Sequence, residues 1–149
     1  MDDIDRDLLA LLQRDAGRTY AELGREVGLS AGAAHERVRK LRASGVIRRT
    51  VVDVDPAAVG LDVLAFVTVD SVAWMGDSGP AFTAVTEIQE AHVIAGTASV
   101  LLKVRTTSTE AMQDVLRRIH AIEGVSSTQA TVVLETFFER TIPTGGTAG

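Results

Sequence analysis

Residues 19–41 contain two helical patterns separated by a short turn, and this spacing restricts the local fold more than any other feature of the sequence. Thr19 and Glu22 form a capping box, the signature of a helix start. Gly28 stands at the carboxyl end of that helix, where a glycine permits the positive φ of a tight turn. Ser30 then caps a second helix. The pattern predicts a helix-turn-helix.

The second helix of this motif has an apolar face and a polar face. Leu29 precedes it as a buried anchor, and Ala34, Val38 and Leu41 share the apolar face. This packing directs another set of residues outward near the amino-terminal end, the end that enters a major groove in DNA-binding proteins of this type. The set is Ser30, Ala31, Gly32, His35, Glu36 and Arg39. Its small members allow close approach to a duplex, and its three long side chains can reach base edges.

A basic run follows. The chain has a net charge of −5, but residues 1–53 hold ten basic and nine acidic residues, and no acidic residue lies between Arg37 and Arg49. The candidate phosphate contacts are Arg37, Lys40, Arg42, Arg48 and Arg49. A solvated helix face is the alternative explanation for such a run. Arg37 has a further alternative, an ion pair with Asp5, Asp7 or Glu22.

Residues 1–53 are expected to form one domain. Ile4, Leu8, Leu11 and Leu12 repeat at helical spacing and predict a first helix that stops near Gly17. Gly45 is expected to end the third helix, and Val46–Ile47 with Val51–Val52 to form a short hairpin that serves as a wing. A winged helix-turn-helix results, although three packed helices of this kind also occur as purely structural units.

The rest of the chain predicts a second domain of another class. Residues 54–62 have the character of a hinge, with one helical turn at most. Residues 63–140 give the order strand, helix, strand, strand, helix, strand, which is the ferredoxin-like βαββαβ pattern, so the fold class is α+β. The expected elements are strands at 63–72, 91–95, 100–106 and 127–138, a helix at 79–88, and a helix between a Thr107/Glu110 capping box and Gly124. Residues 141–149 are expected to be a flexible tail.

The predicted sheet is apolar on both faces. Leu64 and Phe66 alternate with Val67 and other apolar residues in the first strand, and the last strand has the same character. Because two helices cover only one face, a second copy of the sheet is expected to cover the other in an isologous dimer. Packing of the first domain onto the sheet is the alternative.

Several classes of function are excluded or disfavoured. The chain has no cysteine, its three histidines are scattered, and it lacks a phosphate-binding glycine loop and a Gly-x-Ser-x-Gly motif. We therefore expect no enzyme, no metal site and no cofactor. The acidic start is unlike a signal peptide, and no apolar run approaches the roughly 20 residues that cross a bilayer. A soluble cytoplasmic protein with no membrane partner is expected.

Together these segments resemble the Lrp/AsnC (leucine-responsive, feast/famine) transcription regulators. The matching segments are 3–9, 28–30, 36–41, 45–47, 63–69, 90–96, 101–104, 124–125 and 131–135, so only the tail is unmatched. The resemblance implies a winged helix-turn-helix joined to a ligand-sensing, dimerising ferredoxin-like domain. It also implies dimers that stack into tetramers, octamers or larger discs and respond to amino acids.

One turn departs from the family pattern. The family commonly has Gly-Asp-x-Asp between the second and third strands of the sensor domain, near an effector site at dimer–dimer contacts, whereas this chain has Gly96, Thr97, Ala98 and Ser99. Hydroxyls thus replace both carboxylates, and neutral hydrogen bonds are roughly half as strong as charge-assisted ones. The turn and Thr131, expected on the adjacent strand, are the candidate effector site; a plain tight turn is the alternative.

The sequence therefore predicts a sequence-specific DNA-binding transcriptional regulator. Its expected partners are double-stranded DNA with a pseudo-palindromic operator, a small-molecule effector such as an amino acid or related metabolite, and further copies of itself in a homodimer, tetramer or octamer. Two alternatives remain: an architectural DNA-binding protein without an effector, and a small-molecule-binding domain with a structural helical appendage. Trp74 and Met75 are either an oligomer contact or a partly buried loop anchor.

Overall fold

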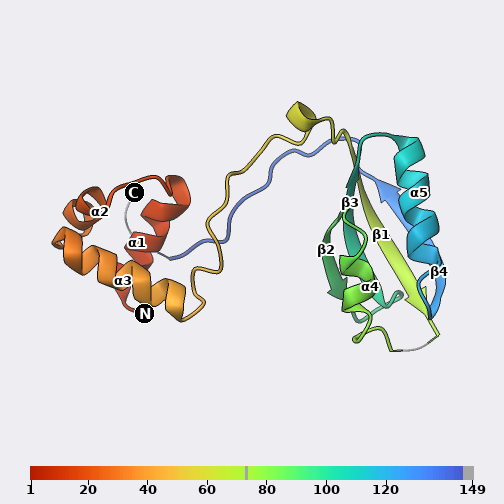
Figure 1. Cartoon of the computed structure of the whole chain (residues 1–149), viewed down its shortest axis with the longest axis horizontal. Coiled ribbons are helices and arrows are strands. Elements are labelled where there is room, and N and C mark those ends of the chain that lie inside the picture. Colours follow the sequence, from red (N-terminus) through yellow and green to blue (C-terminus); the bar gives the residue numbers. More distant parts are fainter. Residues whose placement is uncertain (73, 146–149) are drawn as a thin grey trace. The chain divides into compact units, whose positions relative to one another are not determined.

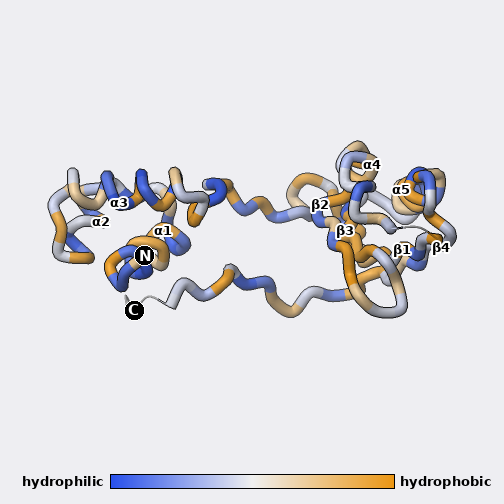
Figure 2. The backbone as a smooth tube through the Cα atoms, turned by 90° about the horizontal axis from the view of Figure 1, so that it is seen from below, coloured by the Kyte–Doolittle hydropathy of each residue, from blue (hydrophilic) through white to orange (hydrophobic). Residues whose placement is uncertain are grey.

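The computed structural model describes residues 1–72 and 74–145 and divides the chain into two compact units. The first comprises Met1–Asp53 together with the segment that begins at Phe138, and the second comprises Val54–Phe137. The chain therefore passes between the units twice, once after the first three helices and once after the last strand (Figure 1). Figure 2 shows hydrophilic and hydrophobic residues alternating along both connecting segments.

The first unit is a three-helix bundle made of α1 (Asp3–Arg14), α2 (Tyr20–Val27) and α3 (Ala31–Ala43). The predicted caps of α2 and α3 are confirmed. The Thr19 and Glu22 side chains each accept the other's backbone N–H, and the Ser30 hydroxyl accepts the N–H of Ala33. The buried core is Leu8, Leu11, Leu23, Ala34 and Val38. Leu41 is also buried, as its place on the apolar face predicts.

The predicted wing is wrong. Residues 44–62 are all described, and they contain no strand. The Ile47 N–H bonds to the Leu41 carbonyl, which ties the chain to the end of α3, and Val51 and Val52 are exposed. The three residues between the expected strands, Arg48–Thr50, include no glycine or asparagine to form the tight turn that a short hairpin requires. The predicted helical turn of the hinge is confirmed as a 3₁₀ turn, η1 (Ala57–Val59).

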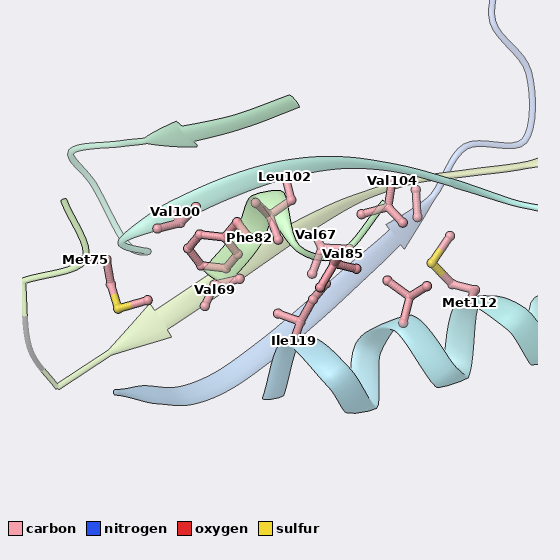
Figure 3. Close-up of a cluster of buried hydrophobic side chains, with 12 residues drawn as sticks. Val67, Val69, Met75, Phe82, Val85, Val100, Leu102, Val104, Met112 and Ile119 are labelled. Carbon is pink, nitrogen blue, oxygen red and sulfur yellow. The ribbon is translucent and has the colours of Figure 1, made fainter. Parts of the chain in front are cut away.

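The second unit is a four-stranded antiparallel sheet with two helices on one face (Figure 1). Its elements are β1 (Val63–Ser71), α4 (Gly79–Thr83), β2 (Ile88–Val93), β3 (Val100–Thr106), α5 (Thr109–His120) and β4 (Val125–Val132), in the sheet order β2-β3-β1-β4. This is the predicted βαββαβ order. Figure 3 shows side chains of β1 and β3, such as Val67 and Leu102, meeting Phe82 of α4 and Ile119 of α5 in the core.

Several helix and strand boundaries in this unit differ from the predicted ones. The helix expected at 79–88 ends at Thr83, and β2 begins at Ile88 rather than at residue 91. The cap of α5 is Ser108, whose hydroxyl accepts the N–H of Ala111, so the Thr107/Glu110 capping box is wrong by one residue. The last strand ends at Val132 instead of residue 138. Its neighbour β1 begins at Val63, so the ladder ends soon after the bond from the Val133 N–H to the Leu64 carbonyl.

The uncovered face of the sheet is mostly polar, whereas the sequence predicted a substantially apolar one. Strand alternation places Leu64, Phe66 and Leu101 on it, with Phe66 39% exposed. The remaining residues on this face are polar or charged: Thr68, Asp70, Glu90, His92, Lys103, Arg105, Ser127, Gln129 and Thr131. Val132 belongs to the helix-covered face, and the apolar residues that follow it lie outside the sheet.

Residues 141–145 lie against α1 of the first unit, although the sequence predicted a flexible tail at 141–149. The Gln13 side-chain amide donates to the Ile142 carbonyl at 3.0 Å, and the Arg6 guanidinium donates to the Thr144 carbonyl at 3.3 Å. The rest of the expected tail, residues 146–149, lies outside the described residues.

Candidate nucleic-acid interface

The outer face of α3 has the arrangement that the sequence predicts. The buried residues Ala34, Val38 and Leu41 hold the helix against the bundle. The candidate DNA contacts Ser30, Ala31, Gly32, His35, Glu36, Arg39, Lys40 and Arg42 are all exposed, as are Arg48 and Arg49 beyond the helix. A Cβ atom at Gly32 would meet no atom within 4 Å, so the amino-terminal turn of α3 leaves open space for a docking duplex.

The turn between α2 and α3 depends on a glycine that the sequence analysis missed. The Leu29 N–H bonds to the Gly24 carbonyl at 2.7 Å, which draws the turn onto α2. A Cβ at Gly24 would lie 2.6 Å from the Leu29 carbonyl oxygen, closer than real contacts allow. The available signal was a glycine inside a helical pattern, which lowers helix propensity and often marks close packing. Gly28 has the predicted positive φ, 71°.

Glu36 and Arg39 form a bidentate ion pair on the exposed face of α3. Arg39 Nε and Nη2 each donate to a Glu36 carboxylate oxygen at 2.8 Å, and Lys40 Nζ lies 3.9 Å from the same carboxylate. Hydrogen bonding from Arg39 lowers the pKa of Glu36 to about 2, so the carboxylate stays charged at neutral pH. Exposed pairs of this kind contribute little to stability. Arg39 can therefore exchange Glu36 for a phosphate or a base edge at low cost.

Arg37 forms ion pairs with two carboxylates at the start of α1. Its Nη1 lies 2.8 Å from Asp2 Oδ2 and 2.9 Å from Asp5 Oδ1, and these contacts join α3 to the start of α1. The pKa of Asp2 is lowered, first by the Asp5 backbone N–H and then by Arg37. The alternative that the sequence analysis gave for Arg37, pairing with Asp5, is confirmed. A phosphate contact by Arg37 would have to compete with two carboxylates.

We expect Arg37→Gln to lower the melting temperature of the first unit and to leave the salt dependence of DNA binding unchanged. The substitution removes the cation between Asp2 and Asp5, which then repel each other, but removes no phosphate contact. Differential scanning fluorimetry and a salt titration of DNA affinity measure the two effects. A salt slope that falls by about one per subunit would instead assign Arg37 to the phosphate backbone.

The His35 ring packs against the ring of Tyr20 of α2. The two ring centroids are 4.5 Å apart, with an interplanar angle of 43°. The Tyr20 hydroxyl also accepts a long hydrogen bond from Arg42 Nη1 at 3.5 Å. Tyr20 thus orients two candidate DNA contacts. The sequence analysis did not single it out, because nothing local shows which residue of α2 faces position 35.

The candidate effector turn joins β2 to β3. The Ile94 N–H bonds to the Ser99 carbonyl, and the Ser99 N–H bonds to the Val69 carbonyl of β1, so both ends of the turn are anchored. Gly96 has a φ of 156°. Thr97 is exposed and Ser99 is half-buried, so an incoming group can reach the Thr97 hydroxyl.

Thr131 does not share a crevice with this turn in one chain. The sequence analysis expected β4 beside β3, but β1 lies between them. Val69 pairs with Val100 on one side and Thr128 on the other. Thr131 is thus two strand spacings and three residues from Val100, which amounts to roughly 14 Å. Its neighbour is Phe66, on the uncovered face.

Comparison with known proteins gives agreement over nearly the whole chain. Residues 1–42 match the AsnC-type helix-turn-helix domain, and residues 62–143 match the Lrp/AsnC ligand binding domain. The transcriptional regulator FL11 of Pyrococcus horikoshii is 34% identical over 142 residues, 95% of this chain and 94% of its own, and LrpA of Mycobacterium tuberculosis is 36% identical over 140 residues, 93% of each. The chain belongs to the Lrp/AsnC family of transcriptional regulators.

A solved structure supports the same assignment. A feast or famine regulatory protein from Mycobacterium tuberculosis, complexed with L-methionine, superimposes with a TM-score of 0.88 at 34% identity, over 95% of this chain and 98% of its own. The Lrp/AsnC family consists of DNA-binding regulators with a ligand-binding domain, not of enzymes. The family resemblance stated from the sequence is therefore confirmed, as are the helix-turn-helix and the four-stranded sheet domain.

The remaining candidate features of this Lrp/AsnC chain are His92, the possibility of a metal site, and the residues Trp74 and Met75. His92 Nε2 lies 3.3 Å from Glu90 on the uncovered face of the sheet. No group of three histidines or acidic residues that could hold a metal ion occurs among the described residues. Met75 is buried, as a loop anchor is, whereas Trp74 is 75% exposed. Within residues 1–72 and 74–145, no helix is long and apolar enough to span a bilayer.

Proposed function

We propose that this chain is a sequence-specific regulator that binds a pseudo-palindromic operator as a symmetric oligomer and responds to an amino acid or a related metabolite. The observation that carries the DNA-binding part is the outer face of α3. There the amino-terminal turn has small side chains, Arg39, Lys40 and Arg42 are exposed toward the carboxyl end, and the opposite face is buried. Such a helix can enter a major groove and read base edges.

Symmetry follows from the short reach of one recognition helix. A single helix contacts only a few base pairs, so specificity requires two helices on successive faces of the duplex. Phe66, which is 39% exposed, and half-buried Leu101 beside it on the uncovered sheet face support pairing with a second copy. The polar residues around these two side chains would then lie at the rim of the interface, where hydrogen bonds to water persist.

The effector is proposed from the family and from the turn at Gly96–Ser99. A relative binds L-methionine, and in this chain the hydroxyls of Thr97 and Ser99 replace the carboxylates expected from the family pattern. A ligand that binds one assembly state more tightly than another shifts the population toward that state. We propose the turn at dimer–dimer contacts as the contact for such a ligand, and Thr131 as a candidate only from a second copy.

The experiment that tests the DNA-binding part is a titration of the full chain against the duplex upstream of its own gene. Affinity should fall steeply with salt, because each phosphate contact lowers the logarithmic slope by about 0.9. A scrambled duplex of the same length and composition is the control. Equal affinity for both duplexes would contradict sequence specificity, and a flat salt dependence would contradict the role of the basic residues.

The effector part is tested by thermal shift against the common amino acids. A ligand at a hundred times its dissociation constant adds about 2.7 kcal/mol of stability, a readily measured shift. Restoring carboxylates with Thr97→Asp/Ser99→Asp should strengthen binding of an α-ammonium group, while Thr107→Asp, outside the turn, should not. No shift with any amino acid in either protein would favour an effector-independent architectural role, which the missing carboxylates make the second candidate.

A further inference from the structure

We infer that the outer face of α1 is a docking surface for residues 141–145 of the same chain, and that this contact fastens the DNA-binding unit to the sensor domain a second time. Two hydrogen bonds carry the contact. Gln13 Nε2 donates to the Ile142 carbonyl at 3.0 Å, and Arg6 Nη1 donates to the Thr144 carbonyl at 3.3 Å. Figure 1 shows the segment that follows β4 returning to α1 before residue 146.

The two donors are placed for an extended segment. Arg6 and Gln13 are seven residues apart, or about two helical turns, so they share one side of α1. Leu8 and Leu11, which are buried, occupy the opposite side and pack into the bundle. The docking surface is therefore separate from the core, and α1 uses both of its faces.

The segment presents its backbone rather than its side chains. Pro143 fixes its own φ and holds Ile142 in an extended conformation. Carbonyls two residues apart in an extended chain point to the same side, which matches acceptors at Ile142 and Thr144. The Ile142 side chain stays 77% exposed, so it is not the group recognised. A Cβ at Gly145, which has a φ of +70°, would lie 3.4 Å from Arg6 Nη1, so the backbone also approaches Arg6 closely there.

When residues 141–145 are docked, the chain connects the two units through a second and shorter segment. From Val132, the end of β4, to Ile142 there are ten residues, which span at most about 36 Å when fully extended. From Ala43, the end of α3, to Val63 there are twenty, which span at most about 70 Å. The docked segment is therefore the shorter of the two connections, and its release leaves only the longer one.

The docking surface lies on the helix that also positions α3. Asp5 of α1, next to Arg6, pairs with Arg37 of α3 at 2.9 Å. A movement of β4 in the sensor domain thus has a short covalent path, through residues 133–141, to the helix that holds the DNA-reading element. This is a physical connection between the two units that does not pass through the hinge.

Cross-linking of the full chain tests the inference directly. The protein has no cysteine, so only introduced thiols react. Gln13→Cys/Ile142→Cys, treated with a short bis-maleimide, should give mainly an intrachain product of monomer size on a denaturing gel. The control Arg25→Cys/Ile142→Cys places the first thiol on an exposed position of α2 and should give at least severalfold less.

Three outcomes decide the result. The reactive pair already lacks the Gln13 amide, so addition of Arg6→Ala removes the remaining recognition bond and should lower the intrachain yield severalfold. Equal yields from the Gln13 and Arg25 pairs would overturn the inference, since an undocked segment reacts with both. A covalent dimer as the main product would also overturn it, because the segment would then dock on a second copy.

Discussion

Reversal of two charges on α3, in Arg39→Glu/Lys40→Glu, should weaken binding to the operator by roughly a hundredfold or more at 0.1 M salt. The change removes one candidate base contact and one candidate phosphate contact and adds two negative charges to a face that must approach phosphates. Glu36, a carboxylate, would lose both of its ion-pair partners and add to the repulsion. Fluorescence anisotropy with a labelled duplex at several salt concentrations measures the affinity and its salt slope.

The matched control is Arg117→Glu/Arg118→Glu on α5. These arginines are also neighbours on an exposed helix face, where Arg117 pairs with Asp114 in the same i,i+3 arrangement as Arg39 with Glu36. The control carries the same change in net charge but lies in the sensor domain. If both double variants lost affinity equally, overall charge rather than α3 would explain the binding, and the proposed interface would be wrong.

The second large effect is expected on stability. Gly24→Ala should destabilise the first unit by roughly 1–3 kcal/mol, because overpacking at a tight site forces the backbone to move. The added Cβ would lie 2.6 Å from the Leu29 carbonyl oxygen and 3.0 Å from that of Ser30. Both atoms are backbone and cannot rotate away, so the turn itself must shift. Thermal or chemical unfolding followed by circular dichroism measures the change.

Gly32→Ala supplies the control with the same chemical change. Gly32 lies inside α3 with no atom within 4 Å of a Cβ. Alanine in a helix interior is favoured over glycine by up to about 1 kcal/mol, so this variant should be as stable as the parent or more so. Two glycines eight residues apart should thus respond with opposite signs. A stabilising effect of Gly24→Ala would show that the turn does not pack as described.

Local signals predicted the bundle and its recognition helix well. Helix caps are bonds between residues three apart, so Thr19, Glu22 and Ser30 identify helix starts without knowledge of the rest of the fold. The exposed face of α3 follows from helical periodicity for the same reason. Most errors of boundary lie where a neighbouring strand decides the outcome. The last strand ends at Val132 because its partner strand β1 begins only two residues before Ala65, which pairs with Val132. The sequence of β4 does not show this.

The residues of the candidate site also differ in whether local sequence signals or long-range contacts determined their roles. The sequence supplied the exposed residues of α3, but only the structure decided that Arg37 is paired, because its partners Asp2 and Asp5 are 35 and 32 residues away. The sequence also identified the turn at Gly96–Ser99 as a candidate effector site. The order of strands, which places β1 between β3 and β4, separated that turn from Thr131.

By itself, the sequence determined the class of both domains, the starts of the DNA-binding helices and the face that α3 presents. The helix starts and the exposed face depend on bonds within one turn of helix and on helical periodicity, and the class of the second domain depends on the order of its elements. The tertiary structure alone decided the absence of the wing in residues 44–62, the close packing at Gly24, the partners of Arg37 and the return of residues 141–145 to α1. The partners of Arg37 and the return of residues 141–145 depend on contacts between residues distant in the chain. The packing at Gly24 and the path of residues 44–62 depend on how the chain turns after a helix, which helical periodicity does not specify.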